Sequence, residues 1–227
     1  MFPFTIKKSA LLERNNYNEW EKICNVFGLM PYRSIDNNNN TNISQLIIRP
    51  AKLEDLSELT EVLVYGFYEF PYLLEWIYSL LKLGIYEDLR NRLSSHSPFY
   101  CCLIAIVIEP QGKQSIVGTV EVAIRYPSPF SLDSQYPYIS NLVVMPHYRR
   151  QGIGKKLLAK CEQIALNWGY YETRLHVLKD NEGAKQLYLN HGYKLARSQS
   201  NWSDFFFFPS QRLLLSKQLS TNFPSQL

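Results

Sequence analysis

The chain has 227 residues, of which 46% are hydrophobic, 14% aromatic and 19% charged. This balance is typical of a globular protein with one domain plus an extension, and it excludes disordered, collagen-like and coiled-coil chains. The net charge of +4 suits a polyanionic small molecule or an acidic partner, but it is too weak to indicate nucleic-acid binding.

The sequence also predicts where the protein does not belong. No run of about 18 apolar residues occurs, so we expect no transmembrane helix and no membrane partner. The N-terminus lacks the apolar core of a signal peptide, and acidic residues at Glu13 and Glu19 disfavour a transit peptide. The four cysteines (Cys24, Cys101, Cys102, Cys161) lack the spacing of zinc ligands. We therefore expect no metal, reduced thiols and a cytoplasmic location.

Two regions are expected along the chain. Residues 1–43 are predicted to form a partly disordered N-terminal extension, because the asparagine-rich run Asp36–Asn42 is typical of a linker. Residues 44–220 are predicted to form the folded domain. Hydrophobic periodicity and turn residues predict its elements in chain order: a strand at 45–49, helices at 53–67 and from after 71 to 93, strands at 100–109, 115–126 and 138–144, a helix at 152–168, a strand at 173–177, a helix at 182–190, and strands at 193–198 and 204–214.

This order of elements predicts an α+β (mixed α/β) domain, in which helices cover both faces of a mixed sheet. The expected change from strand to helix between 144 and 152 carries the most informative residues. There the strand is followed by Arg149-Arg150-Gln151-Gly152-Ile153-Gly154-Lys155. Unpaired N–H groups and the positive dipole at a helix start attract an anion, and glycines allow it to approach the backbone. The arginines and the lysine add charged donors, so the segment predicts a diphosphate site.

Other phosphate motifs do not fit this segment. A Walker A loop and a Rossmann fingerprint both require a glycine spacing that is absent here. The bland alternative is an ordinary helix start with solvated arginines. The coincidence of strand, proline, paired arginines and amphipathic helix favours the anion site over that alternative.

The segment Val144-Met145-Pro146 followed by Arg149–Gly154 resembles the acetyl-CoA motif of the GNAT superfamily of N-acetyltransferases. A later series agrees with that family's closing pattern: Leu175-His176-Val177, Asn181, Ala184, Leu187-Tyr188 and Gly192-Tyr193. The resemblance is sharp over 138–193 and looser back to 45, and the sequence also looks like plastid, cyanobacterial and protein N-terminal acetyltransferase-like members. It implies a mostly antiparallel mixed sheet of six or seven strands, acetyl-CoA as cosubstrate, and a plastid stroma as a second location that fits.

The resemblance also implies which residues bind the coenzyme. The backbone of Leu142, Val143 and Val144 would bind pantetheine, and the Leu142 N–H would stabilise the oxyanion of the thioester carbonyl. Asn181 would bond the pantetheine arm. The diphosphate would be held by the loop and helix start, namely Arg149, Arg150, Gln151, Gly152, Ile153, Gly154 and Lys155.

Three residues are predicted to be catalytic by the same resemblance. Tyr188 matches the family's usual general acid, because a phenol stays protonated at neutral pH and can protonate a leaving thiolate. His176 matches the base of protein N-terminal acetyltransferases, and Tyr138 matches an assisting tyrosine. Each residue has a purely structural alternative. Tyr188 would be a tyrosine packed in the core, His176 a strand histidine whose hydrogen bonds are satisfied within the protein, and Tyr138 an aromatic residue at the start of a strand. Glu121 on the preceding strand remains the alternative base. The other histidines (His96, His147, His191) are assigned to the surface or to helix ends.

The acceptor is less constrained by the sequence. Phe70, Pro71 and Tyr72 lie where the family often builds its acceptor wall, and Trp202 with Phe205–Phe208 would form the opposite wall. The leading hypothesis is direct acetyl transfer to a protein or peptide amine, by a monomer or a homodimer. The alternatives are a small-amine acetyltransferase and a non-catalytic acyl-CoA-binding module.

Overall fold

A computed structural model describes residues 32–34, 45–67, 75–126, 134–196 and 212–220. Their strands form one sheet in the order β1-β2-β3-β4-β5-β6-β8-β7. The strands are β1 (Tyr32–Ser34), β2 (Gln45–Pro50), β3 (Tyr100–Ile108), β4 (Gln114–Arg125), β5 (Tyr136–Val144), β6 (Glu172–Leu178), β7 (Lys194–Leu195) and β8 (Arg212–Gln218). The α-helices are α2 (Leu56–Phe67), α3 (Glu75–Ser94), α4 (Ile153–Asn167) and α5 (Glu182–Asn190), with short 3-10 turns at Leu53–Asp55 and Pro146–Tyr148.

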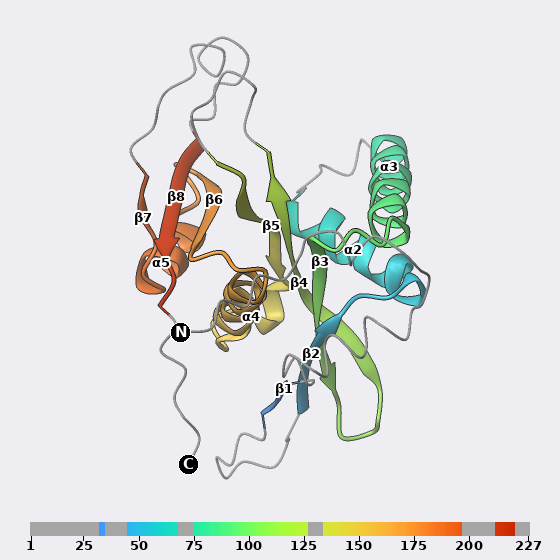
Figure 1. Cartoon of the computed structure of the whole chain (residues 1–227). Coiled ribbons are helices and arrows are strands. Elements are labelled where there is room, and N and C mark those ends of the chain that lie inside the picture. The colour runs from blue at the N-terminus through green and yellow to red at the C-terminus, as the bar shows by residue number, and fades with distance from the viewer. Residues whose placement is uncertain (1–31, 35–44, 68–74, 127–133, 197–211, 221–227) are drawn as a thin grey trace, which may run out of the picture. The chain divides into compact units, whose positions relative to one another are not determined.

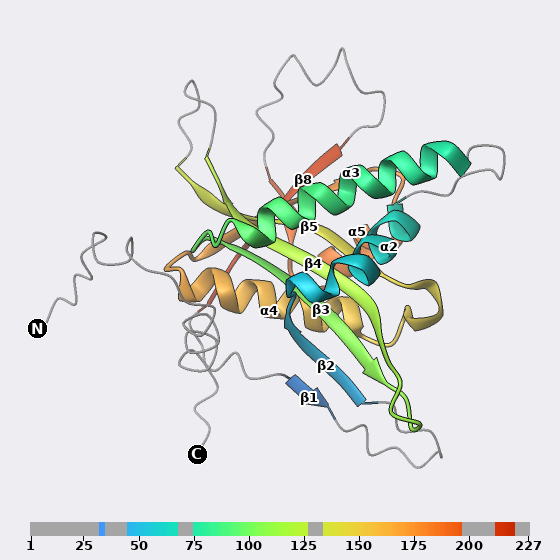
Figure 2. The same ribbon diagram turned by 90° about the vertical axis from the view of Figure 1, so that its right-hand side faces the viewer.

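The sheet is antiparallel at every described pairing except the parallel pair β5–β6. Figure 1 shows α2 and α3 on one side of this sheet and α4 and α5 on the other, and Figure 2 shows α3 in front of the strands with α4 behind them. The predicted fold class, a mixed and mostly antiparallel sheet between two helix layers, is confirmed.

Alternating side chains of the central strands supply a core to each face, as expected for a sheet covered on both sides. Cys102 and Ile104 of β3 pack with Leu59 and Leu63 of α2 on one face. The opposite face is covered by α4, whose inward side chains are fully or almost fully buried: Ile153, Leu157, Leu158, Cys161, Ile164 and Ala165. Both cores support the central strand β5, which leads into α4.

The predicted elements between 45 and 190 agree with the structure to within about two residues at most boundaries. The C-terminal strands differ more. The strand predicted at 193–198 is the two-residue β7, and β8 begins at Arg212 and ends at Gln218, beyond the predicted end at 214. One strand was not expected from the sequence: β1 lies within the predicted extension and pairs with β2. Residues 1–31 lie outside the described part, and the boundary of the extension at residue 43 stays a prediction.

Candidate active site

The loop between β5 and α4 has the backbone shape of an anion site. Arg150 and Gly152 both have left-handed backbone angles, with φ of 64° and 78°. The helix α4 begins at Ile153 with no side-chain cap, and its first internal bond runs from the Lys156 N–H to the Gly152 carbonyl at 3.0 Å. The N–H groups before Lys156 therefore have no partner within the helix. Together with the positive end of the helix dipole, they form an arrangement that binds phosphate.

Side chains of the same loop hold its shape. The Arg149 Nε donates to the Val144 carbonyl at 2.9 Å, and the Gln151 Nε2 donates to the His147 carbonyl at 3.2 Å. Arg149 thus ties the loop to the end of β5. Its neighbour Arg150 and the first-turn Lys155 are exposed, so their charges lie at the protein surface where an anion would arrive.

The two glycines of the motif have different structural reasons. Gly152 needs its positive φ, while a Cβ there would meet nothing within 4 Å. A Cβ on Gly154 would lie 3.2 Å from Leu187 Cδ2, on the helix α5. The sequence suggested that Gly154 makes room for a phosphate; in the structure its small size lets α4 and α5 pack closely. Ile153 is 3% exposed, so only its backbone can face a ligand.

Strand β5 separates from β6 where the predicted pantetheine residues lie, while Val143 and Val144 stay paired with β4. It pairs with β6 at Tyr138↔Arg174 and Ile139↔Leu175, although both strands continue beyond that pair. On its other side the register with β4 shifts between Thr119 and Glu121. Leu142 and Val144 are half-buried and Val143 is buried. The backbone of 141–144 therefore borders the place where β5 and β6 diverge.

The predicted base and its assisting tyrosine meet across β5 and β6. The Tyr138 hydroxyl lies 2.9 Å from the His176 Nδ1, and their ring centroids are 5.6 Å apart. His176 is exposed, whereas Tyr138 is 8% exposed. Burial raises the pKa of Tyr138 above its ordinary value, although Arg125, stacked 3.3 Å above the ring centroid, opposes that shift. The buried Tyr138 hydroxyl therefore holds an imidazole ring that solvent can reach.

Tyr188 of α5 is near enough to Tyr138 for the two phenols to influence each other. Burial, with a smaller contribution from the neighbouring phenol of Tyr138, raises the pKa of Tyr188 to about 12. The side chain is 7% exposed and its ring contacts Tyr193 edge to face, with centroids 5.9 Å apart. A phenol in this environment keeps its proton at neutral pH, which a general acid requires.

Asn181 has a role that the sequence analysis missed. Its Oδ1 accepts the Ala184 N–H at 3.0 Å and so caps the N-terminus of α5, the helix that carries Tyr188. The cap uses the oxygen of the carboxamide, whereas the nitrogen is the donor that a pantetheine amide would need. An asparagine before Glu182-Gly183-Ala184 is itself a recognisable cap signal.

The structure adds a buried polar cluster that the sequence suggested only in part. Glu121 of β4 is 2% exposed and contacts Arg92, Tyr100 and Asn141. The available signal was a carboxylate within the apolar strand 115–126. Its partners could not be inferred, because Arg92 lies on a different element, 29 residues earlier.

Some predicted residues lie outside the described part of the chain, namely Phe70, Pro71 and Tyr72 of one acceptor wall and Trp202 with Phe205–Phe208 of the other.

Among the described residues, no group of three His, Cys, Asp or Glu side chains could hold a metal ion. None of the described helices has the length and apolar character of a membrane span. Cys161 is fully buried, and burial raises the pKa of its thiol, so it cannot act as an acyl carrier.

Comparison with known proteins gives relatives of one kind. The chain is 30% identical over 154 residues to GCN5-related N-acetyltransferase 10, chloroplastic, of Arabidopsis thaliana, an alignment that covers 64% of this chain and 60% of that protein. This chain is also 34% identical to the chloroplastic GCN5-related N-acetyltransferase 7 of the same plant. That alignment covers 45% of this chain but only 37% of the other protein. It is 33% identical to the thialysine N-epsilon-acetyltransferase of Mus musculus over 53% of this chain and 71% of that protein.

The fold has solved counterparts as well. The PaiA N-acetyltransferase of Thermoplasma acidophilum, in complex with coenzyme A, superposes with a TM-score of 0.54 and 22% identity, over 76% of this chain and 98% of the other. The sequence profile of the acetyltransferase (GNAT) family matches residues 64–193, which is more than half of the chain and includes the loop, β5, β6 and α5. The protein is therefore a member of the acetyltransferase (GNAT) family.

Proposed function

We propose that this protein is an acetyl-CoA-dependent N-acetyltransferase that transfers the acetyl group directly to an amine of a protein or peptide. The observation that carries the proposal is the pair of Tyr138 and His176 beside the divergence of β5 and β6, with the buried phenol of Tyr188 near Tyr138. An acid and a base at the same place are needed by an enzyme and not by a simple binder. The activated acetyl group would come from the thioester of acetyl-CoA.

The residues of the loop and of β5 fit coenzyme A. The uncapped N–H groups at the start of α4, with the exposed charges of Arg150 and Lys155, match a diphosphate. The backbone of 142–144 offers donors and acceptors to the amides of pantetheine, and the Asn181 nitrogen offers another donor. Arg149 supports the loop through the Val144 carbonyl, which keeps the diphosphate and pantetheine sites in register.

The acid and the base divide the proton transfers between them. His176 would take the proton that the acceptor amine loses as the new C–N bond forms, and the Tyr138 hydroxyl would orient its imidazole. Tyr188 holds the proton that the sulfur requires as the C–S bond breaks. Because Cys161 is buried, the transfer would be direct, within a complex of enzyme and both substrates.

Positive charge around the catalytic pair favours a protein amine over a polyamine. Arg125 stacks on Tyr138, whereas Arg174, 4.4 Å from the ring centroid of the neighbouring Tyr136, is already paired with Glu172 at 2.8 Å. Arg212 contributes a further positive charge near Tyr138. A polycationic acceptor would be repelled here, whereas a single amine on an otherwise neutral or acidic peptide would not.

A small amine is the second candidate. It is supported by the similarity to the mouse thialysine N-epsilon-acetyltransferase, of which the chain covers 71%. The chloroplastic relatives support a plastid stroma as the location, ahead of the cytoplasm expected from the sequence.

The test is to incubate the purified full chain with acetyl-CoA and three acceptor sets: a peptide library, lysine with thialysine, and polyamines. Mass spectrometry would locate acetyl groups on α- and ε-amines, and coenzyme A binding would be measured by calorimetry. We expect acetylated peptides. Acetylation of small amines alone would establish the second candidate, and coenzyme A binding without acetylation of any acceptor would indicate a non-catalytic module.

A further inference from the structure

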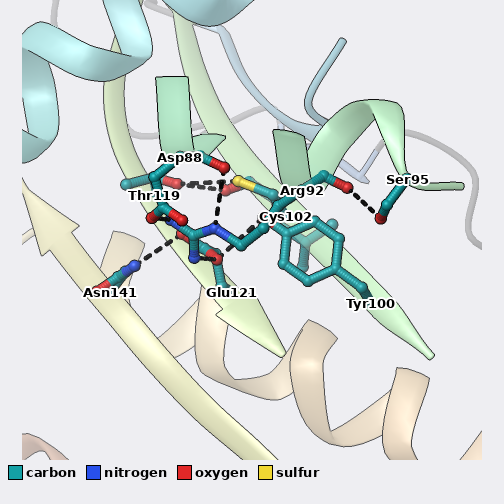
Figure 3. Close-up of polar contacts among 9 residues, drawn as sticks. Asp88, Arg92, Ser95, Tyr100, Cys102, Thr119, Glu121 and Asn141 are labelled. Carbon is teal, nitrogen blue, oxygen red and sulfur yellow. Dashed lines mark hydrogen bonds and ion pairs between the residues drawn. The ribbon is translucent and has the colours of Figure 1, made fainter. Parts of the chain in front are cut away.

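The cluster around Glu121 lies directly beside the strand proposed to hold the cosubstrate. Figure 3 shows the Glu121 carboxylate between Arg92, Tyr100 and Asn141, which come from α3, β3 and β5. The two carboxylate oxygens have different partners. Oε2 accepts from the Arg92 guanidinium and, at 2.9 Å, from the Tyr100 hydroxyl, whereas Oε1 accepts from the Asn141 Nδ2 at 2.7 Å.

Asn141 is the residue at which β5 departs from regular pairing. Its φ is 54°, in the left-handed region, which asparagine tolerates better than most residues. In the ladder Thr119 pairs with Val143 and Glu121 pairs with Ser140. Asn141 and Leu142 therefore face a single residue of β4, which is the definition of a β-bulge. A bulge leaves a backbone group out of the ladder, and the two bulged residues here are Asn141 and Leu142.

We propose that Glu121 is a positioning residue for the acetyl transfer. Its carboxylate holds Asn141 in the left-handed conformation and so keeps the Leu142 N–H out of the β4–β5 ladder, available to the thioester carbonyl. This inference rests on the proposed function. The same contacts exclude Glu121 as the base that deprotonates the acceptor amine, because the side chain is 2% exposed and both oxygens already accept hydrogen bonds.

The remaining contacts of the cluster explain why the Glu121 carboxylate keeps one orientation. Arg92 also pairs with Asp88, one turn earlier on α3, so the guanidinium lies between two carboxylates. Burial raises the pKa of Tyr100, and its hydroxyl is therefore a permanent donor to Glu121. Because Arg92 and Tyr100 both bind Oε2, the carboxylate stays oriented with Oε1 toward Asn141. The Glu121 carboxylate thus links Arg92 of α3 to Asn141 of β5, the strand proposed to hold the cosubstrate.

The closest test compares two carboxylate-to-amide changes, one inside the cluster and one outside it. Glu121→Gln keeps the shape of the side chain but gives it a donor, which no longer matches the three donors around it. Glu87→Gln changes a 49% exposed carboxylate of α3 that pairs with Arg90, and it leaves the cluster and the bulge untouched. We expect kcat to fall about 10- to 100-fold in Glu121→Gln, with the KM for acetyl-CoA within about threefold, and no change in Glu87→Gln.

A second pair of variants separates positioning from folding. Asn141→Gly keeps the left-handed conformation accessible without the hydrogen bond, whereas Asn141→Ala loses both. We expect Asn141→Gly to retain most of the turnover that Asn141→Ala loses, although both lose the bond to Glu121. Equal loss in the two variants, or normal kcat in Glu121→Gln, would overturn the proposal.

A readout without catalysis distinguishes this proposal from the proposed function. Hydrogen–deuterium exchange of the full chain would be followed with and without acetyl-CoA, in peptides covering 138–145 and 150–160. We expect acetyl-CoA to protect both peptides in the wild type. In Glu121→Gln we expect the same protection of 150–160 but weaker protection of 138–145, because only the bond to the thioester carbonyl is lost. No protection in the wild type would contradict the proposed function itself, whereas equal protection in both proteins would contradict only the role of Glu121.

Discussion

At the scale of single residues, the environment of Tyr188 makes it a suitable acid. The phenol is 7% exposed, and its pKa of about 12 keeps it protonated through the physiological range. Replacement by phenylalanine removes the transferable proton and little volume. We expect Tyr188→Phe to lower kcat by about 100-fold or more, with nearly unchanged coenzyme A affinity by calorimetry. Normal turnover would show that another group protonates the sulfur.

Tyr193 supplies the matched control for that variant. Its hydroxyl lies 2.9 Å from the Thr173 hydroxyl in the core, so it bonds within the protein. Tyr193→Phe leaves the threonine without that partner. We expect a loss of about 1 kcal/mol in the free energy of unfolding, measured by urea denaturation, and an unchanged kcat.

His176 carries the prediction that depends on pH. A histidine changes charge between about pH 5 and 8, and only its neutral form can accept a proton. We expect the wild-type kcat/KM to fall as the pH is lowered through this range, and His176→Gln to lack that limb and to be slower by at least tenfold near neutral pH. The exposed His147 gives the control, since His147→Gln should keep the full profile. A limb that persists in His176→Gln would assign the base to another residue.

At the scale of elements, the closeness of α2 to β5 depends on Gly66. A Cβ at this position would lie 2.2 Å from Val143 Cγ1, so this valine of β5 would have to move. We expect Gly66→Ala to lower the free energy of unfolding by about 1–3 kcal/mol and to weaken coenzyme A binding. Gly84 in α3 has no atom within 4 Å of its Cβ position, so Gly84→Ala should instead stabilise by about 0.5–1 kcal/mol. Urea denaturation and calorimetry measure both effects.

The same scale shows what the sequence could predict. Helical periodicity located α4 and α5, and turn residues bounded β3 and β4, because these signals lie within one segment. The resemblance to the family assigned Tyr138 and His176 to one site, but the contact between them was not predicted. The bulge at Asn141 depends on the register between two strands, and β1 has three residues with too short a pattern to detect. Features of this kind depend on contacts between distant segments.

At the scale of the whole molecule, one buried cluster joins three elements. Glu162 of α4 lies 2.7 Å from the Lys217 Nζ on β8 and 3.3 Å from the His191 Nε2 at the end of α5. Burial alone would raise the pKa of Glu162, but the contacts with His191 and Lys217 outweigh it and lower that pKa below its ordinary value. The cluster therefore fastens β8 to the helices only while the carboxylate is ionised.

The sign of the resulting pH dependence follows from linkage. A carboxyl group whose pKa is lower in the folded than in the unfolded protein stabilises the fold above the unfolded pKa, near 4.3 to 4.5, and loses this contribution as the pH falls through the folded pKa. We expect the melting temperature of the wild type to fall between about pH 5 and 3 more steeply than that of Glu162→Gln. The exposed Glu54 serves as control, since Glu54→Gln should follow the wild type. Parallel curves for all three proteins would show that Glu162 contributes nothing to acid sensitivity.

The narrow junction between β5 and β6 has a consequence for their backbone groups. The register joins the two strands over two residue pairs, at one end, while longer antiparallel ladders hold β5 to β4 and β6 to β8. Beyond those two pairs, the facing edges of β5 and β6 lack partners in the ladder. Backbone N–H and C=O groups on such an edge are satisfied by water, by side chains or by a bound molecule. A ligand with amide groups would exchange hydrogen bonds with this edge much as an added strand does.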